Sequence, residues 1–273
     1  MAFGPHFNYS IFCWTLVTTL FLQILSNLAN DYGDYKKGTD NKERIGPERA
    51  LQSGAITKKE MFTGIVITGL LSFLSGLYLL YISFGDEEFL SALLWLGIGV
   101  MCIVAAIKYT MGKKAYGYYA LGDVAVFVFF GIVGVFGSYY LQERYMNKIV
   151  FLVASAYGLW CTAVLNLNNM RDVENDIKFN KKTTAYLLGF EGAKFYHSAL
   201  IIVPYALIAI ALTQPFYSST YLLFTAIPLS FIQLLAIIKT EDRIEFDKWL
   251  KFQSITTFLN AVLLFLFIYL MYA

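Results

Sequence analysis

The sequence is poor in charged residues. Only 15% of its 273 residues are Asp, Glu, Lys or Arg, against about 25% in ordinary soluble domains, while 58% are hydrophobic. A globular interior for a chain of this length has no room for that much apolar surface. The shortage of charge therefore excludes an ordinary soluble protein, and the apolar excess excludes a disordered chain.

Cysteine and net charge are also in short supply. Three cysteines, Cys13, Cys102 and Cys161, are too few for a disulfide scaffold and show no Cys-x-x-Cys relation. A net charge of +2 is too small to indicate a nucleic-acid partner. His197 has no second ligand at a metal-binding spacing. These shortages leave a membrane protein as the broad class.

Long apolar runs are what the sequence has in abundance. Eight stretches are each long enough to cross a bilayer as a helix, which takes roughly 17–25 residues. The alternation typical of membrane β-strands is absent. The sequence therefore predicts an all-α integral membrane protein, a polytopic bundle of transmembrane helices. The expected spans are residues 9–29, 61–84, 89–107, 120–140, 149–167, 195–212, 221–238 and 252–272.

The few charges are unevenly distributed between the loops. Of the 21 Lys and Arg residues, all but Arg144 and Lys148 fall on one side of the predicted bundle. The positive-inside rule assigns that side to the cytoplasm. Both ends of the chain then face outward.

Acidic and amide side chains gather on the same side, where the first and fifth predicted spans end. Residues three and four apart share a helix face, so the members of each group can project together. The alternative is a pair of solvated loops of mixed charge. The first group is Asn27, Asn30, Asp31 and Asp34, and the second is Asn168, Asp172 and Asp176.

Carboxylate and amide oxygens at the mouth of a bundle are ligands that suit Mg²⁺. Carboxylates alone would repel a diphosphate, but basic residues are interspersed in the same loops. A transporter would more often bury its ionisable residues near the bilayer midplane. The mixture therefore favours a magnesium–diphosphate site over a cation pathway. The interspersed basic residues are Arg44, Arg49, Arg171, Lys181 and Lys182.

Three motifs resemble those of UbiA-type membrane prenyltransferases. NDYGD at residues 30–34, followed by RIGPER at 44–49, resembles the first aspartate-rich region of that family. NNMRD at 168–172, with Asp176, resembles the second, and KYTMGK at 108–113 is similar to the Tyr-x-x-x-Lys motif of the central loop. Within that family, the sequences of these motifs are most similar to those of the 1,4-dihydroxy-2-naphthoate polyprenyltransferase branch. The resemblance covers nearly the whole chain, which we therefore expect to be one such domain over residues 1–273.

This resemblance implies Mg²⁺-dependent transfer of a polyprenyl group from polyprenyl diphosphate to 1,4-dihydroxy-2-naphthoate. CO₂ and diphosphate are lost, and the product is demethylmenaquinol for menaquinone biosynthesis. The expected surroundings are the lipid bilayer of the plasma (inner) membrane, with multiple spans, cytoplasmic active-site loops and no nucleic acid. The sequence does not indicate an oligomeric state. Two alternatives stay open: another aromatic acceptor of the hydroxybenzoate or homogentisate type, or a membrane transporter or inactive scaffold.

The resemblance also assigns roles to residues. Tyr109 would stabilise an allylic cation. Asp123, at the entrance to the fourth predicted span, is a carboxylate that the resemblance leaves unassigned, and it would either take a proton from the aromatic acceptor or cap a helix start. Relatives carry an aspartate at the position of Gly38; either Asp40 would substitute for it, or this branch manages without it. The expected metal ligands are Asn27, Asn30, Asp31, Asp34, Asp172 and Asp176, with Asp40 and Asn168 as further candidates. The expected diphosphate ligands are Arg44, Arg49, Arg171 and Lys182, and the expected catalytic residues are Asp123, Tyr109 and Lys113.

One departure from the family concerns the start of the chain. The family has nine transmembrane helices, whereas the sequence predicts eight. Residues 1–8 look like the connection that follows the first family helix, and the charge distribution independently places the amino terminus outside. We therefore expect the first family helix to be missing from this chain.

Overall fold

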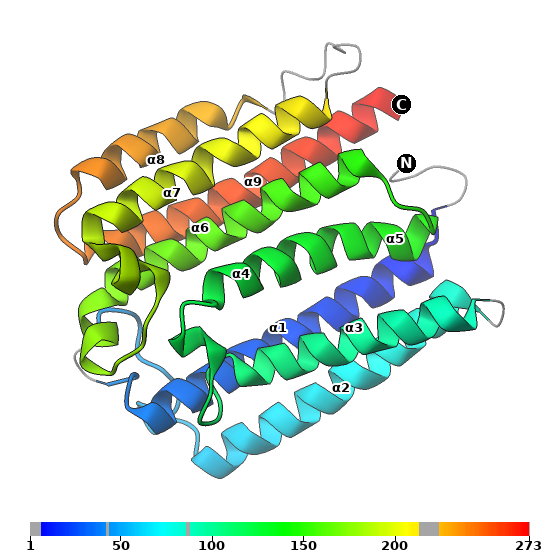
Figure 1. Ribbon diagram of the computed structural model, residues 1–273. Coiled ribbons are helices and arrows are strands. Elements are labelled where there is room, and N and C mark those ends of the chain that lie inside the picture. Colours follow the sequence, from blue (N-terminus) through cyan, green and yellow to red (C-terminus); the bar gives the residue numbers. More distant parts are fainter. Residues whose placement is uncertain (1–6, 42–43, 86–87, 213–223, 273) are drawn as a thin grey trace.

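The computed structural model describes residues 7–41, 44–85, 88–212 and 224–272 as a bundle of long helices (Figure 1). Within these ranges no strand forms, apart from one isolated bridge between Tyr119 and Lys182. The all-α prediction is confirmed. The elements are α1 (Tyr9–Lys37), α2 (Lys58–Phe84), α3 (Phe89–Lys108), η1 (Tyr116–Tyr118), α4 (Gly122–Val126), η2 (Phe127–Gly137), α5 (Ser138–Glu143), α6 (Lys148–Lys178), α7 (Thr184–Ala211), α8 (Ile227–Lys239) and α9 (Glu245–Tyr272).

Seven helical segments of the described chain are long and apolar enough to cross a membrane: α1, α2, α3, the continuous run from α4 through η2 to α5, α6, α7 and α9. They correspond to seven of the eight predicted spans. The remaining one, 221–238, begins outside the described ranges, and α8 within it has 13 residues, fewer than the roughly 17 a crossing needs. That eighth crossing stays a prediction. The expectation that residues 1–8 are a connection following a missing first helix falls largely on residues 1–6, which lie outside the residues that the structure describes.

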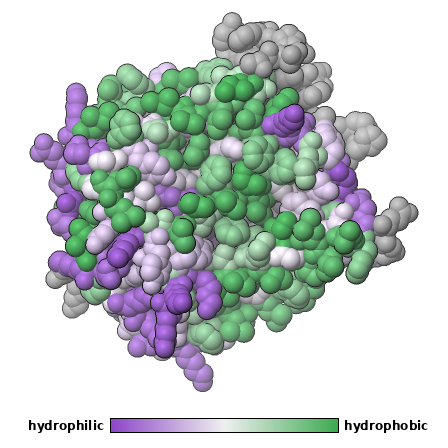
Figure 2. All heavy atoms as spheres, viewed as in Figure 1, coloured by the Kyte–Doolittle hydropathy of each residue, from purple (hydrophilic) through white to green (hydrophobic). Residues whose placement is uncertain are grey.

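The surface of the bundle separates by polarity. Figure 2 shows hydrophobic residues over the middle of the helices and hydrophilic residues gathered at the end where α1 and α6 finish. Many large apolar side chains are exposed along the helices, among them Leu20, Leu70 and Val104. In a helix bundle this pattern is the one expected where lipid, rather than water, covers the outside.

Helices α1 and α6 both continue past their apolar runs into polar sequence. α1 ends only at Gly38, which adopts a left-handed conformation (φ 80°) and donates its backbone N–H to the carbonyls of Asp34 and Tyr35. α6 continues to Lys178. Because both polar ends remain helical, their side chains are fixed relative to the bundle.

Helix α6 lies at the centre of the packing, against α7, η2 and α9, while α1 packs against α2 and α3. The contact with η2, a π-helical segment, depends on two glycines. A Cβ added to Gly131 would lie 2.6 Å from the Cα of Gly158 on α6. Small residues at such crossings let membrane helices approach closely. The glycines therefore serve packing, and η2 is held against the helix that carries the second acidic group.

Gly33 fixes the polar end of α1 against the connection that follows α3. An added Cβ there would lie 2.4 Å from Oγ1 of Thr110, a buried side chain that donates a hydrogen bond to the Ala29 carbonyl. We expect Gly33→Ala to destabilise the protein by about 1–3 kcal/mol, because the added methyl group would force α1 away from Thr110. Thermal unfolding in detergent measures this. Gly97→Ala, at a position with nothing within 4 Å of the added Cβ, is the control, and an equal effect of the two would contradict the prediction.

Candidate active site

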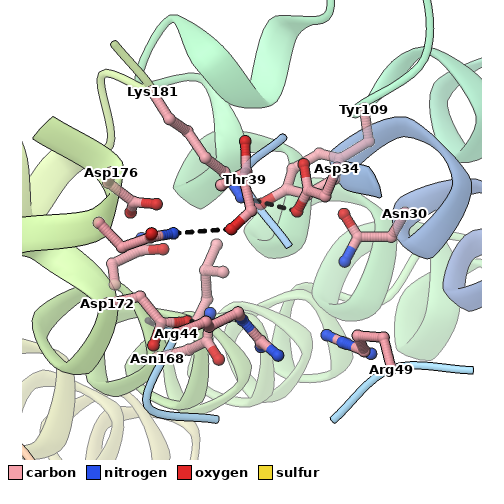
Figure 3. Close-up of a pocket in the computed structure, with 13 residues that line it drawn as sticks. Asn30, Asp34, Thr39, Arg44, Arg49, Tyr109, Asn168, Asp172, Asp176 and Lys181 are labelled. Carbon is pink, nitrogen blue, oxygen red and sulfur yellow. Dashed lines mark hydrogen bonds and ion pairs between the residues drawn. The ribbon is translucent and has the colours of Figure 1, made fainter. Parts of the chain in front are cut away.

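A cavity lies between the polar ends of α1 and α6. Figure 3 shows Asn30 and Asp34 from α1 on one side and Asn168, Asp172 and Asp176 from α6 on the other. The two acidic groups, far apart in the sequence, thus line one space. The remaining lining residues are Thr39, Arg44, Arg49, Tyr109, Leu165, Asn169, Asn175 and Lys181.

Asp34 is buried and held at both of its carboxylate oxygens. The Tyr118 hydroxyl donates to Oδ1 at 2.7 Å, and Nζ of Lys181 lies 2.9 Å from Oδ2. The Tyr118 hydroxyl oxygen is also 2.6 Å from the hydroxyl oxygen of Thr39. Burial, followed by the neighbouring Asp34 carboxylate, raises the pKa of Tyr118, so its hydroxyl remains a donor. Asp34 is therefore a fixed carboxylate facing the cavity.

On the opposite side, the stripe on α6 follows helical spacing. Asn168, Asp172, Asn175 and Asp176 lie three and four residues apart and share one face. The side-chain amide of Asn175 donates to the Thr39 carbonyl at 2.8 Å and so ties α6 to the end of α1. This bond closes one side of the cavity and keeps the two acidic groups in register.

Three basic side chains balance three carboxylates around the cavity. Arg44, Arg49 and Lys181 line it together with Asp34, Asp172 and Asp176. Nε of Arg44 lies 3.5 Å from Asp172 and 3.5 Å from Asp40, and Arg49 pairs with Asp31 at 2.7 Å. The lining as a whole is therefore close to neutral, and an anionic group can enter without net repulsion if a cation accompanies it.

Lys181 is positioned by pairing between two connections. The backbone N–H of Lys182 donates to the Tyr118 carbonyl at 3.3 Å, and the Ala120 N–H donates to the Lys182 carbonyl at 2.6 Å. Burial alone would lower the pKa of Lys181, but Asp34 and Asp176 raise it above its ordinary value. The ammonium group therefore stays charged between the two acidic groups.

Asn27, Lys113, Lys182 and Arg171 are predicted site residues that lie outside the lining of the cavity. Asn27 is exposed and accepts a hydrogen bond from Gln23 at 3.5 Å. The side chains of Lys113 and Lys182 are exposed, in the turn after α3 and in the connection after α6. Arg171 is buried and pairs with Asp172 and Asp247. The structure brings none of these four to the cavity wall, and Lys181 takes the place expected for Lys182.

Asp31 and Asp40 lie just behind the cavity, each beside an arginine that lines it. Burial and the nearby Asp34 carboxylate raise the pKa of Asp40 to about 6, although Arg44 acts in the opposite direction. Asp40 is therefore half-protonated near pH 6 and mostly ionised at neutral pH. It supports Arg44 from behind rather than lining the cavity.

Asp123 is buried at the start of α4, and the residue before it lies against Tyr109 of the cavity wall. A Cβ added to the preceding Gly122 would lie 3.0 Å from the Tyr109 hydroxyl oxygen. The start of α4 has no side-chain capping bond, and the carboxylate of Asp123 instead accepts hydrogen bonds from Tyr196 and Thr184 of α7. Its Oδ2 atom is buried and accepts no hydrogen bond from the described residues. The structure thus gives no support to the capping role.

Several lining residues were not among the predicted ligands. Lys181 stood among the interspersed basic residues, but nothing in the sequence separated its role from that of Lys182. Asn175 continues the spacing of three and four residues on α6 and was recognisable from that periodicity. Thr39 and Leu165 carried no signal, because only the folding of the loop after α1 and the packing of α6 place them there.

The donor set fits a magnesium ion shared with a phosphate. Within the described ranges, no three Asp, Glu, His or Cys side chains converge closely enough to hold a metal by themselves. Mg²⁺ usually takes only one or two carboxylates and completes its shell with water and substrate phosphates. The lining offers oxygen donors, and Oδ1 of Asn30 is buried with no hydrogen-bond partner in the described part of the chain.

Comparison with known proteins identifies the family. Residues 1–262 match the model of the UbiA prenyltransferase family. The chain is 45% identical over 224 residues to a 1,4-dihydroxy-2-naphthoate octaprenyltransferase of Haemophilus influenzae, covering 82% of this chain and 72% of that protein. It is also 45% identical over 198 residues to the protein of the same name in Escherichia coli, covering 72% of this chain and 63% of the relative.

A more distant relative is UbiA prenyltransferase domain-containing protein 1 of Danio rerio, 29% identical over 224 residues, with 79% of this chain and 61% of the relative covered. The alignments to the E. coli and D. rerio proteins thus span less than two thirds of those proteins. No solved structure matches the chain significantly. These matches indicate an aromatic prenyltransferase, and members of this family are generally dependent on a divalent metal. The chain belongs to the UbiA prenyltransferase family.

Proposed function

We propose that the chain transfers a polyprenyl group from polyprenyl diphosphate to 1,4-dihydroxy-2-naphthoate, releasing CO₂ and diphosphate. The product would be demethylmenaquinol, an intermediate of menaquinone biosynthesis. The observation that carries the proposal is the cavity in which carboxylates of α1 and α6 face each other with three basic side chains between them. The names of the bacterial relatives support the choice of acceptor and donor.

The diphosphate head of the donor would bind in this cavity. Arg44, Arg49 and Lys181 would contact its non-bridging oxygens, which planar guanidinium groups and an ammonium group suit. Asp34, Asp172 and Asp176, with Asn30, would hold Mg²⁺ between protein and diphosphate. Bound Mg²⁺ would neutralise the diphosphate and so make it a better leaving group.

Tyr109 would stabilise the allylic cation that departure of the diphosphate leaves behind. Its ring lines the cavity and packs edge-on against Tyr116 at 5.4 Å between centroids. Burial raises the pKa of the Tyr109 hydroxyl, so the ring stays neutral. An aromatic face stabilises a desolvated cation by about 0.5–2 kcal/mol. The enclosing side chains also exclude water, which would otherwise trap the cation as an alcohol.

The acceptor would lie beside Asp123, on the membrane side of Tyr109. A ring hydroxyl of the naphthoate would donate to the free Oδ2, and this bond would orient the ring and raise its electron density. The carboxylated ring carbon would form the new C–C bond to the prenyl group. The bond to the carboxylate would then break, and its electron pair would return to the ring as CO₂ leaves.

Asp123→Asn is expected to lower turnover by about 10²-fold, the lower end of the 10²–10⁴ that proton-handling groups contribute. The amide keeps the shape of the side chain but is a poorer acceptor and takes no proton. Initial rates measured against naphthoate concentration test this, and Glu174→Gln, at an exposed position of α6, serves as a control substitution. Full turnover by Asp123→Asn would remove this residue from the chemistry.

We further propose that the cavity opens to the cytoplasm from the plasma membrane. The basic residues concentrated on its side of the bundle support this orientation through the positive-inside rule.

A direct assay tests the proposed function. Purified protein would be supplied with Mg²⁺, octaprenyl diphosphate and one of three acceptors: 1,4-dihydroxy-2-naphthoate, 4-hydroxybenzoate or homogentisate. We expect a prenylated, decarboxylated product from the naphthoate alone. Turnover of another acceptor in place of the naphthoate would assign the chain to a different branch of the family. No transfer to any acceptor would favour a transporter or an inactive scaffold.

A further inference from the structure

Each of the three guanidinium nitrogens of Arg171 donates to a protein acceptor. Its Nε and Nη2 atoms donate to the two oxygens of Asp172 at 2.8 and 2.9 Å, and Nη2 also donates to Asn168 at 2.7 Å. Nη1 donates to Oδ1 of Asp247 at 2.8 Å. The side chain is only 3% exposed. Arg171 is therefore placed to orient carboxylates rather than to bind the diphosphate directly.

The loop after α1 packs against both Arg171 and Arg44. A Cβ added to Gly46 would lie 2.8 Å from Nη2 of Arg171 and 2.9 Å from the guanidinium carbon of Arg44. Arg44, not Arg171, lines the cavity and lies 3.5 Å from Asp172. Asp172 is thus held between one arginine that faces the cavity and another that lies behind it.

Asp247 is the second carboxylate on Arg171, and it comes from the first turn of α9. Its Oδ2 atom pairs with Lys251 at 2.7 Å, while its Oδ1 atom faces Arg171. The sequence gives this acidic position no role, because it lies in a connection of mixed charge 76 residues beyond Arg171. The fold brings it within one side chain of the cavity.

We infer that Asp247 is a positioning residue that sets the orientation and availability of Asp172 through Arg171. The inference rests on the proposed function. Arg171 donates hydrogen bonds to two carboxylates, so its positive charge is shared between Asp172 and Asp247. Asp172 is therefore fixed in place without being the sole partner of this buried charge. Without the Asp247 carboxylate, Arg171 would pair with Asp172 alone. Asp172 would then be less available to a magnesium–diphosphate complex.

Binding of magnesium pyrophosphate to purified protein, measured by isothermal titration calorimetry, tests this apart from turnover. We expect Asp247→Asn to raise the dissociation constant by about three- to tenfold, a range typical of coupled neighbours. The matched control is Glu245→Gln, which removes the same charge from the same turn of α9 at an exposed position. We expect Glu245→Gln to bind like the wild type. In prenyl transfer, Asp247→Asn should raise KM for the diphosphate donor more than it lowers kcat.

Arg171→Lys distinguishes two roles of Asp247: positioning Asp172 through Arg171, or merely attaching α9 to α6. Lysine keeps the positive charge but lacks the planar fork that spans both carboxylates, so it should weaken pyrophosphate binding by itself. In that background, Asp247→Asn should add no further loss. Additive losses, or wild-type binding by Asp247→Asn, would overturn the inference.

Asp247→Glu keeps the carboxylate one methylene further out and should show a smaller loss than Asp247→Asn. If Asp247→Asn does not stay folded, Arg171→Lys decides the question, and a wild-type dissociation constant for that variant would overturn the inference. Wild-type protein that neither binds magnesium pyrophosphate nor transfers a prenyl group would instead contradict the proposed function.

Discussion

Replacing Asp172 with alanine is expected to lower the rate of prenyl transfer by about 10²–10³-fold, the usual effect of removing one preorganised group that stabilises a transition state. Asp172 lines the cavity opposite Asp34, and its carboxylate is the shared partner of Arg44 and Arg171. Its loss would remove a metal ligand and leave two guanidinium groups without their common partner. Initial rates at saturating Mg²⁺ measure the effect.

Glu174→Gln is the matched control for this prediction. Glu174 lies two residues further along α6, but its side chain is 70% exposed and pairs with Arg243 on the outside of the helix. We expect its rate to remain within about twofold of the wild type, as for most surface substitutions. A melting temperature for both variants separates lost chemistry from lost folding. If folded Asp172→Ala kept the wild-type rate, this cavity would not be the catalytic site.

Lys181→Met is expected to lower transfer by about 10²-fold, because the ammonium group would stabilise the charge that develops on the departing diphosphate. Lys181 is held 2.9 Å from Asp34 and close to Asp176, so it lies between the two acidic groups. Methionine keeps the length and apolar stem of the side chain but removes the charge. Rates measured against donor concentration should show both a higher KM and a lower kcat.

Lys182→Met, one residue away, should leave the rate nearly unchanged. Its side chain is exposed, and the backbone bonds that it makes to Tyr118 and Ala120 survive the substitution. Because the two variants lose the same charge from the same connection, they differ only in which side chain reaches the cavity. A larger loss in Lys182→Met would return the diphosphate contact to the residue that the sequence motif first indicated.

The acidic groups were predictable because they lie on regular helices. Once α1 and α6 continue past their apolar runs, a spacing of three and four residues places Asn30 with Asp34 and Asn168 with Asp172. Asn27 has the same spacing but is exposed one turn earlier. Periodicity therefore predicts which residues share a face, but not how far along the helix the cavity extends.

The basic residues were harder to place, because most of them lie in connections or carry long side chains. Arg171 belongs to the acidic motif, yet its guanidinium lies behind Asp172 and also pairs with a carboxylate of α9. Lys113 fits a family motif but its side chain is exposed. A long, flexible side chain can reach several partners from one backbone position, so only the neighbouring elements decide which partner it meets.

The sequence by itself determined the membrane class, seven of the spanning helices and the two acidic groups, since hydrophobic length and helical period are local properties. Only the tertiary structure decided which charges work together. It brought Lys181 rather than Lys182 to the cavity through the pairing of two connections, and it placed Asp247 behind Arg171. Those choices depend on contacts between segments distant in sequence, which no local pattern records.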